Sequence, residues 1–163
     1  MKTELQSQLV AKYPSIFREI GGKPEETCMA FGIECGDGWH DLIDALCEQI
    51  DFHVNWTNRI NPTYKFGVVA AQVKEKFGSL RFYVDFIYDH NLDQHAMKRI
   101  SASIERVGGM IAMAEAISAK TCEACGNKCI PEDAPFPRAQ CDACRAEIEE
   151  ANHQNSYFKE NHK

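Results

Sequence analysis

Residues 66–87 read FGVVAAQVKEKFGSLRFYVDFI, and this stretch decides the fold. Two runs rich in β-branched and aromatic residues, 66–74 and 80–87, flank the segment 75–79, which contains Gly78. Such runs form strands, and a short glycine-containing segment between them forms a turn. The stretch therefore predicts a β-hairpin.

The second strand of this hairpin should have one packed face and one open face, because side chains alternate along a strand. The packed face would carry the apolar residues Leu80, Phe82, Val84 and Phe86. The open face would carry the polar residues Arg81, Tyr83 and Asp85.

One amphipathic helix is expected before the hairpin in the sequence, and another after it. Apolar residues recur at steps of three and four from Trp39 to Val54, after Asp37, which is a suitable helix cap. A second stripe of this kind predicts a long helix over 93–118, interrupted by Gly108-Gly109, which indicates a kink or a close backbone approach to the sheet. The expected fold class is α+β: a β-hairpin or small antiparallel sheet packed by two main helices.

Four cysteines form two matched pairs, Cys122-Glu-Ala-Cys125 and Cys141-Asp-Ala-Cys144, with fifteen residues between them. This spacing is typical of four thiolates that surround a zinc ion. Four cysteine ligands leave no open coordination position, so the ion is expected to be structural. Cys129 could replace one ligand or be an ordinary loop thiol.

Prolines between the cysteine pairs disfavour helix, which predicts a C-terminal four-cysteine zinc ribbon over residues 119–150. The expected organisation is an α+β core domain over 1–118, the zinc-ribbon module over 119–150, and a polar, flexible tail over 151–163. Zinc-dependent folding of such a short module is expected because it has little apolar core of its own.

The overall charge argues against general binding to nucleic acid. The chain has 18 Lys or Arg against 24 Asp or Glu, a net charge of −6, whereas nucleic-acid affinity comes largely from neutralised phosphates. Between Trp56 and Arg81, however, five basic residues accompany one acid. The residues Arg59, Lys74, Arg81 and Tyr83 are therefore candidate ligands for a nucleotide or a nucleic acid.

A hydrolase site is a further alternative. Asp37, His40 and Asp41 are clustered at the start of the first main helix, and such residues can serve in metal-assisted hydrolysis. A second histidine at helical ligand spacing is missing, so we rank this alternative last.

The amino-terminal sequence predicts a cytoplasmic protein that does not enter a membrane. Glu4 stands where a signal peptide would carry apolar residues, and no run of apolar residues is long enough to span a bilayer. A reducing compartment also agrees with cysteines that bind metal rather than form disulfides.

Several blocks resemble a family of small, uncharacterised proteins from tailed phages and prophages that carry a C-terminal zinc ribbon with four cysteine ligands. The blocks are GIECGDGW at 32–39, Leu42-Ile43 with Leu46-Cys47, QVKEKFGSLRFY at 72–83, and residues 118–126. The resemblance covers about residues 28–144 and implies a phage setting and the cytoplasm of a bacterial host. Small accessory phage proteins commonly alter host enzymes or counter host defences. By analogy, we expect a non-enzymatic protein that binds a host protein as an inhibitor or adaptor.

Overall fold

The structure is a computed structural model that describes residues 1–89, 91–130, 134 and 137–161, with residues 152–161 as helix backbone only. The described part is an α+β fold of α-helices, short 3-10 turns and one sheet. The α-helices are α1 (Thr3–Lys12), α2 (His40–Ile60), α3 (Gln94–Ser118) and α4 (Asp142–Asn161). The strands are β1 (Ile33–Glu34), β2 (Phe66–Lys76) and β3 (Ser79–Tyr88).

The predicted hairpin is confirmed. β2 and β3 pair antiparallel from Phe66 opposite Tyr88 to Lys76 opposite Ser79. The turn is tighter than the five residues expected, because Phe77 and Gly78 both have positive φ, at 53° and 72°. This backbone is that of a two-residue turn matching the twist of the strands.

The sheet contains one parallel and one antiparallel pair of strands. The prediction of an antiparallel sheet is therefore wrong for one strand. β1 lies parallel to β2, with Ile33 opposite Val73 and Glu34 opposite Lys74. The strand order is β1-β2-β3. Residues 28–31 form a 3-10 turn before β1 begins.

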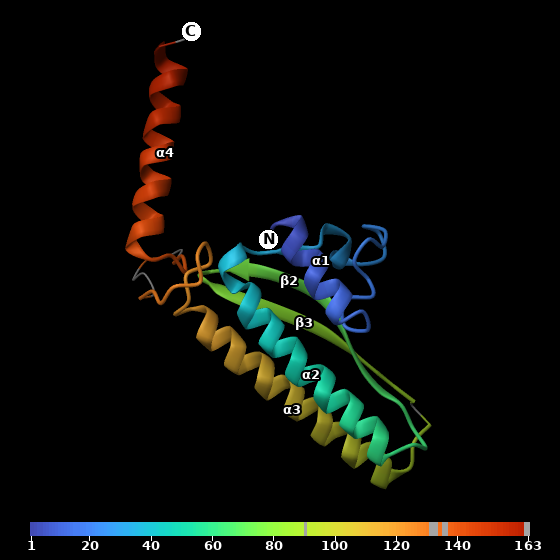
Figure 1. The fold of residues 1–163 in the computed structure, drawn as a ribbon. Helices are drawn as coiled ribbons and strands as arrows, with labels where there is room; N and C mark the ends of the chain where they lie inside the picture. The colour runs from blue at the N-terminus through green and yellow to red at the C-terminus, as the bar shows by residue number, and fades with distance from the viewer. Residues whose placement is uncertain (90, 131–133, 135–136, 162–163) are drawn as a thin grey trace.

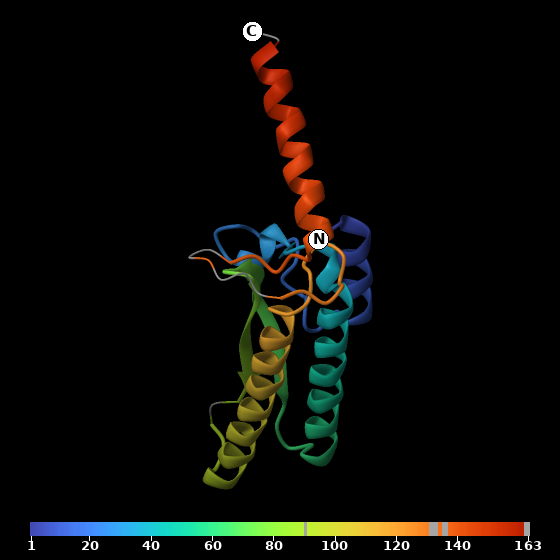
Figure 2. The same ribbon diagram turned by 90° about the vertical axis from the view of Figure 1, so that its left-hand side faces the viewer.

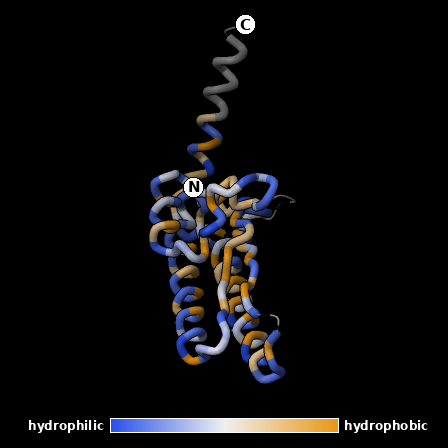
Figure 3. The backbone as a smooth tube through the Cα atoms, turned by 90° about the vertical axis from the view of Figure 1, so that its right-hand side faces the viewer, coloured by the Kyte–Doolittle hydropathy of each residue, from blue (hydrophilic) through white to orange (hydrophobic). Residues whose placement is uncertain are grey.

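α2 and α3 run side by side over one face of the hairpin, as Figure 1 shows. Figure 3 shows hydrophobic and hydrophilic residues alternating along these helices, as expected of amphipathic elements. The core lies between the helices and the sheet. Its residues are Trp39, directly before α2, Ile43 and Ile50 of α2, Val73, Leu80 and Phe82 of the sheet, and Ile100 and Val107 of α3. The opposite face of β3 carries Tyr83, which is 46% exposed.

The outer edge of β3 is covered by side chains of α3. The backbone N–H of Leu80 donates to Ser118 Oγ at 2.8 Å, and that of Phe82 donates to Glu115 Oε1 at 3.1 Å. Unpaired strand edges can recruit other strands, so these bonds protect the sheet. They also hold the end of α3 next to the hairpin turn.

The start of α3 agrees with the sequence prediction, and that of α2 differs from it. Asp93 caps α3 by accepting the N–H of Ala96 at 2.8 Å. Asp37, in contrast, lies in a 3-10 turn (Asp37–Trp39) and accepts the backbone N–H of Lys2 at 2.7 Å instead of capping α2. α2 begins only at His40.

The interpretation of Gly108 and Gly109 as a close approach to the sheet is wrong. Both glycines are exposed, α3 continues through them, and a Cβ built on either one would meet no atom within 4 Å. Replacing either glycine with alanine should raise the free energy of unfolding by about 0.5–1 kcal/mol, because glycine loses more backbone freedom in a helix. Urea denaturation of Gly109→Ala would measure this gain, and a loss of stability would contradict the exposed position.

α4 differs from the expected ribbon and tail. Cys141 directly precedes this helix and Cys144 lies in its first turn. The helix projects away from the body in both views (Figures 1 and 2). Within the described residues of 119–150, β-type pairing is limited to one isolated bridge between Thr121 and Lys128. The segment 145–150 consists of Arg, Ala, Glu and Ile, and such residues favour helix.

Candidate metal centre

Cys122, Cys125, Cys141 and Cys144 converge as the sequence predicted. Their four sulfur atoms all lie within 4.8 Å of one another, and those of Cys125 and Cys141 are 3.7 Å apart. A tetrahedral zinc ion with Zn–S bonds of about 2.3 Å requires sulfur atoms about 3.8 Å apart. The four thiols are therefore arranged to hold a metal ion.

The first cysteine pair lies in a tight backbone turn. The N–H of Cys122 donates to the carbonyl of Asn127 at 2.7 Å, and the N–H of Gly126 donates to the carbonyl of Cys122 at 2.8 Å. Gly126 has a φ of +78°, which favours glycine at this position. These contacts fix the two sulfur atoms on the same side of the turn.

The second cysteine pair lies where α4 begins. Cys141 precedes the helix, its carbonyl accepts the N–H of Arg145 at 3.0 Å, and Cys144 follows three residues later. Residues three apart share one face of a helix, and free N–H groups at the helix start favour negative charge. The start of the helix therefore places both sulfur atoms on the side of the first cysteine pair.

The Cys122 thiol is prepared for ionisation. Burial of the Cys122 thiol raises its pKa. Hydrogen bonds from the backbone N–H groups of Cys141, Cys125 and Ala124 outweigh this effect and lower the pKa to about 6. Metal ions bind the thiolate rather than the thiol, so such a sulfur atom is a good ligand near neutral pH.

Cys129 is buried near this cluster but is not one of the four converging residues. The backbone N–H of Cys129 donates to the carbonyl of Lys120 at 2.9 Å. This bond lies next to the bridge between Thr121 and Lys128 and closes the loop that contains the first cysteine pair. Burial, together with the charge of Cys122, raises the pKa of the Cys129 thiol. These features are those of a structural thiol.

A loop of the core domain packs directly against the first cysteine pair. The N–H of Gly38 donates to the carbonyl of Glu123 at 2.8 Å, and the N–H of Gly36 donates to Glu123 Oε1 at 2.7 Å. Burial raises the pKa of this carboxyl, and the Gly36 N–H opposes that rise. The metal centre is therefore joined to the body of the protein through backbone contacts.

Trp39 completes this junction. Its side chain is fully buried, and its Nε1–H donates to the carbonyl of Thr121 at 2.7 Å. Sequence reasoning identified Trp39 as a core residue but missed the role of Glu123 and of both glycines. The closely spaced glycines at 36 and 38, before a buried tryptophan, were the available signal of a close backbone approach.

The four residues predicted to bind a nucleotide do not form one site. Arg59 stacks on Trp56 at 4.9 Å near the end of α2, where the Asn58 side chain bonds to the backbone of Phe66. Lys74 lies eight residues beyond Phe66 along β2. At about 3.3 Å per residue the two are separated by about 26 Å along the strand, so Arg59 is far from Lys74.

The other three predicted residues do lie together on the hairpin. Lys74 is opposite Arg81 in the strand register, and its Nζ lies 5.9 Å from the ring centroid of Tyr83. Arg81 is also engaged within the protein, because its Nη1 lies 3.7 Å from Glu115 Oε2. Part of the positive charge on this face is thereby balanced internally.

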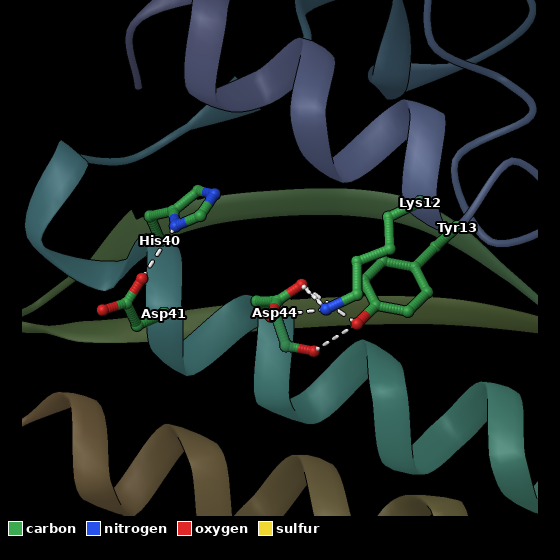
Figure 4. Close-up of polar contacts among 5 residues, drawn as sticks. All are labelled: Lys12, Tyr13, His40, Asp41 and Asp44. Atoms are coloured by element: carbon green, nitrogen blue, oxygen red, sulfur yellow. Dashed lines mark hydrogen bonds and ion pairs between the residues drawn. The ribbon is translucent and has the colours of Figure 1, made fainter.

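The residues considered for hydrolysis are separately engaged. Figure 4 shows His40 turned toward Asp41. His40 Nδ1 lies 2.9 Å from Asp41 Oδ1, while Lys12, the last residue of α1, and Tyr13 after it bind Asp44. Asp37 is occupied by the main chain and side chain of Lys2, which lower the pKa of its carboxyl. The structure thus brings His40 and Asp41 together and pairs Asp37 with Lys2.

Fold and site define a small α+β protein with a four-cysteine centre that can hold a metal ion. No protein-family model, curated protein or solved structure matches the chain. In the parts of the chain that the structure describes, none of the helices combines the length and apolar character needed to cross a bilayer.

Proposed function

We propose that this is a non-enzymatic accessory protein that binds a host protein as an inhibitor or adaptor, with a structural Zn²⁺ on Cys122, Cys125, Cys141 and Cys144. The resemblance to proteins of tailed phages supports the cytoplasm of a bacterial host as its setting. The four-cysteine centre agrees with this setting, because reducing conditions keep thiolates available for metal. Counter-defence is one role that such binding would serve.

Zinc is the metal that the donor set favours. Four thiolates in a tetrahedral arrangement suit Zn²⁺ or an iron–sulfur centre, whereas oxygen-preferring cations need carboxylates. A closed shell of four sulfur atoms leaves no position for substrate or water, which supports a structural role in a ribbon-like module.

The observation that carries the binding function is an apolar groove between α2 and α3. It has a volume of about 150 Å³ and is lined almost entirely by apolar side chains. They are Leu42, Ala45 and Leu46 of α2, with Met110, Met113, Ala114 and Ile117 of α3. Met113 is 62% and Ile117 46% exposed, and flexible methionines suit adaptable protein-binding surfaces.

The exposed face of α3 beside this groove suits the close approach of another helix. Residues 108–119 carry a single charged side chain, Glu115, which is turned toward the sheet by its bonds to Phe82 and Arg81. The exposed positions Gly109 and Ala116, which neighbour Met113 on the helix surface, are both small. A Cβ at Gly109 would meet no atom within 4 Å, so this glycine would let a partner backbone come near.

Charge around the groove indicates the chemistry of the partner. Asp41 and Glu48 are exposed and lie on the same helical stripe of α2 as Ala45, which lines the groove. A partner helix with an apolar face and basic flanking residues would be complementary in shape and charge. The proposed occupant is therefore an amphipathic, basic helix of a host protein.

Affinity capture with matched variants tests this proposal. Tagged wild-type protein should retain a specific partner from host lysate, and Met113→Glu or Ile117→Glu should weaken its binding at least ten-fold, because a charge would be buried in the groove. Tyr83→Glu introduces the same charge at an exposed aromatic residue on the opposite face of β3, and it should leave capture unchanged. Capture that all three variants retain equally would exclude the groove as the binding surface.

A further inference from the structure

Four buried polar side chains gather between α2 and α3, at the end of the helix pair remote from the metal centre. They are His53 and Thr57 on α2, Asn61 directly after it, and Ser103 on α3, each at most 9% exposed. Apolar residues would fill such an interface at lower cost, since burying polar groups is unfavourable unless they are satisfied. A cluster of this kind between amphipathic helices therefore requires its own explanation.

These residues line an open cleft. α2 and the residue that ends it contribute positions 53, 57 and 61 at steps of four, and α3 contributes Arg99, Ser103 and Arg106 at steps of four and three. Such spacing places each set on one helix face. The cleft has a volume of about 190 Å³, and none of its lining residues is acidic.

The two arginines give the cleft an excess of positive charge. Arg99 donates to Asn61 Oδ1 and to His95 Nε2, both at 3.2 Å, and neither acceptor carries a negative charge. In the described part of the chain, no carboxylate lies within ion-pair distance of Arg99 or Arg106. A guanidinium group presents several N–H donors in a planar fork that matches phosphate oxygens.

His53 provides an independent observation that points to a ligand. The side chain is only 7% exposed, and among the described residues Nε2 is buried without a hydrogen-bond partner. Burial and the nearby charge of Arg106 lower the pKa of His53, so that its neutral form is favoured. A neutral ring can present Nε2–H as a donor, and an anion in the cleft would accept that hydrogen bond.

We infer that this cleft binds a phosphate-type oxyanion, held by Arg99 and Arg106, the hydroxyls of Thr57 and Ser103, and Nε2–H of His53. Trp56 forms an outer wall of the cleft, and Arg59 stacks on its ring at 4.9 Å. An aromatic wall next to an anion site suits a phosphomonoester with a planar group. The site uses the other end of the α2–α3 pair from the proposed groove and does not depend on partner binding.

Calorimetric titration of the whole protein with inorganic phosphate and with phenyl phosphate tests the inference. Saturable binding should be seen, weakened at least ten-fold in Arg99→Gln and in Arg106→Gln. Lys98→Gln is the matched control: it removes the same charge from a neighbouring exposed residue of α3 that does not line the cleft. It should leave binding unchanged.

Binding that fails to saturate with either probe, or that Lys98→Gln weakens as much as Arg106→Gln, overturns the inference. Tighter binding of phenyl phosphate assigns the site to a phosphorylated small molecule, and tighter binding of inorganic phosphate assigns it to the free ion. The His53 ring signals in NMR should shift on titration of the wild type and not in Arg106→Gln. Capture of a partner protein by Arg106→Gln would be unaffected, which separates this site from the proposed function.

Discussion

Purified protein should contain one zinc ion per chain, and a strong chelator should unfold the segment 120–145 while the helices and sheet of the body remain folded. The segment has few buried residues of its own, whereas zinc binding to such sequences contributes about 10–16 kcal/mol near neutral pH. Elemental analysis would give the metal content. Hydrogen exchange would show loss of protection at the N–H groups of Cys122, Gly126 and Cys129, which are bonded in the structure.

The matched control for this prediction is within the segment itself. Cys141→Ser removes a sulfur atom from the cluster and should abolish stoichiometric zinc binding, whereas Cys129→Ser changes a buried thiol outside the cluster and should retain zinc. A metal-free chain, or protection that survives chelation, would contradict the proposed centre. If elemental analysis found iron instead of zinc, the four-cysteine site would stand and the assignment of zinc would be wrong.

Trp39 offers an optical readout of the same event. Its Nε1–H donates to Thr121, so the indole should change its fluorescence when the segment unfolds. Trp56 is the second tryptophan of the chain and lies at the other end of α2. Measurement in a Trp56→Phe background would therefore report on Trp39 alone.

The hairpin and both main helices were predictable because each carries a strong local pattern. Alternation in β3 and three-to-four spacing in α2 and α3 follow directly from the geometry of these elements. The metal ligands were predictable for a similar reason, since two pairs at short spacing constrain where the sulfur atoms can lie. In each case the information is confined to a short stretch of sequence.

The features that sequence reasoning missed depend on contacts between distant residues. β1 is two residues long, and its parallel pairing with Val73 and Lys74 has no local signature. α4 was missed because its residues show no apolar stripe, although residues 145–150 favour helix individually. The separation of Arg59 from Lys74 likewise depends on how α2 packs on β2.

The buried polar cluster shows a further limit of periodicity. Ser103 lies on the buried face of α3, between Ile100 and Val107, where the apolar stripe predicts a hydrophobic residue. His53 and Thr57 interrupt the stripe of α2 in the same way. A pattern of apolar residues records which face is buried, but only the structure shows that the exceptions on two helices meet.

Gly38→Ala should lower the free energy of unfolding by about 3 kcal/mol and weaken zinc binding. A Cβ at this position would overlap the carbonyl oxygen of Cys122 and the backbone nitrogen of Gly126, and it would lie 2.7 Å from the nitrogen of Cys125. All three are backbone atoms of the metal-binding turn and cannot rotate away, so either the turn or the loop before α2 must move. Movement would also break the bond from Gly38 N–H to Glu123.

Urea denaturation and competition with a chromophoric zinc chelator would measure both effects. Gly109→Ala is the matched control, because the same added methyl group on the exposed face of α3 meets no atom within 4 Å. The two substitutions should therefore change stability in opposite directions, and only Gly38→Ala should change zinc affinity. If Gly38→Ala left both quantities unaltered, the metal centre would not be joined to the body through this loop, and the two parts would fold independently.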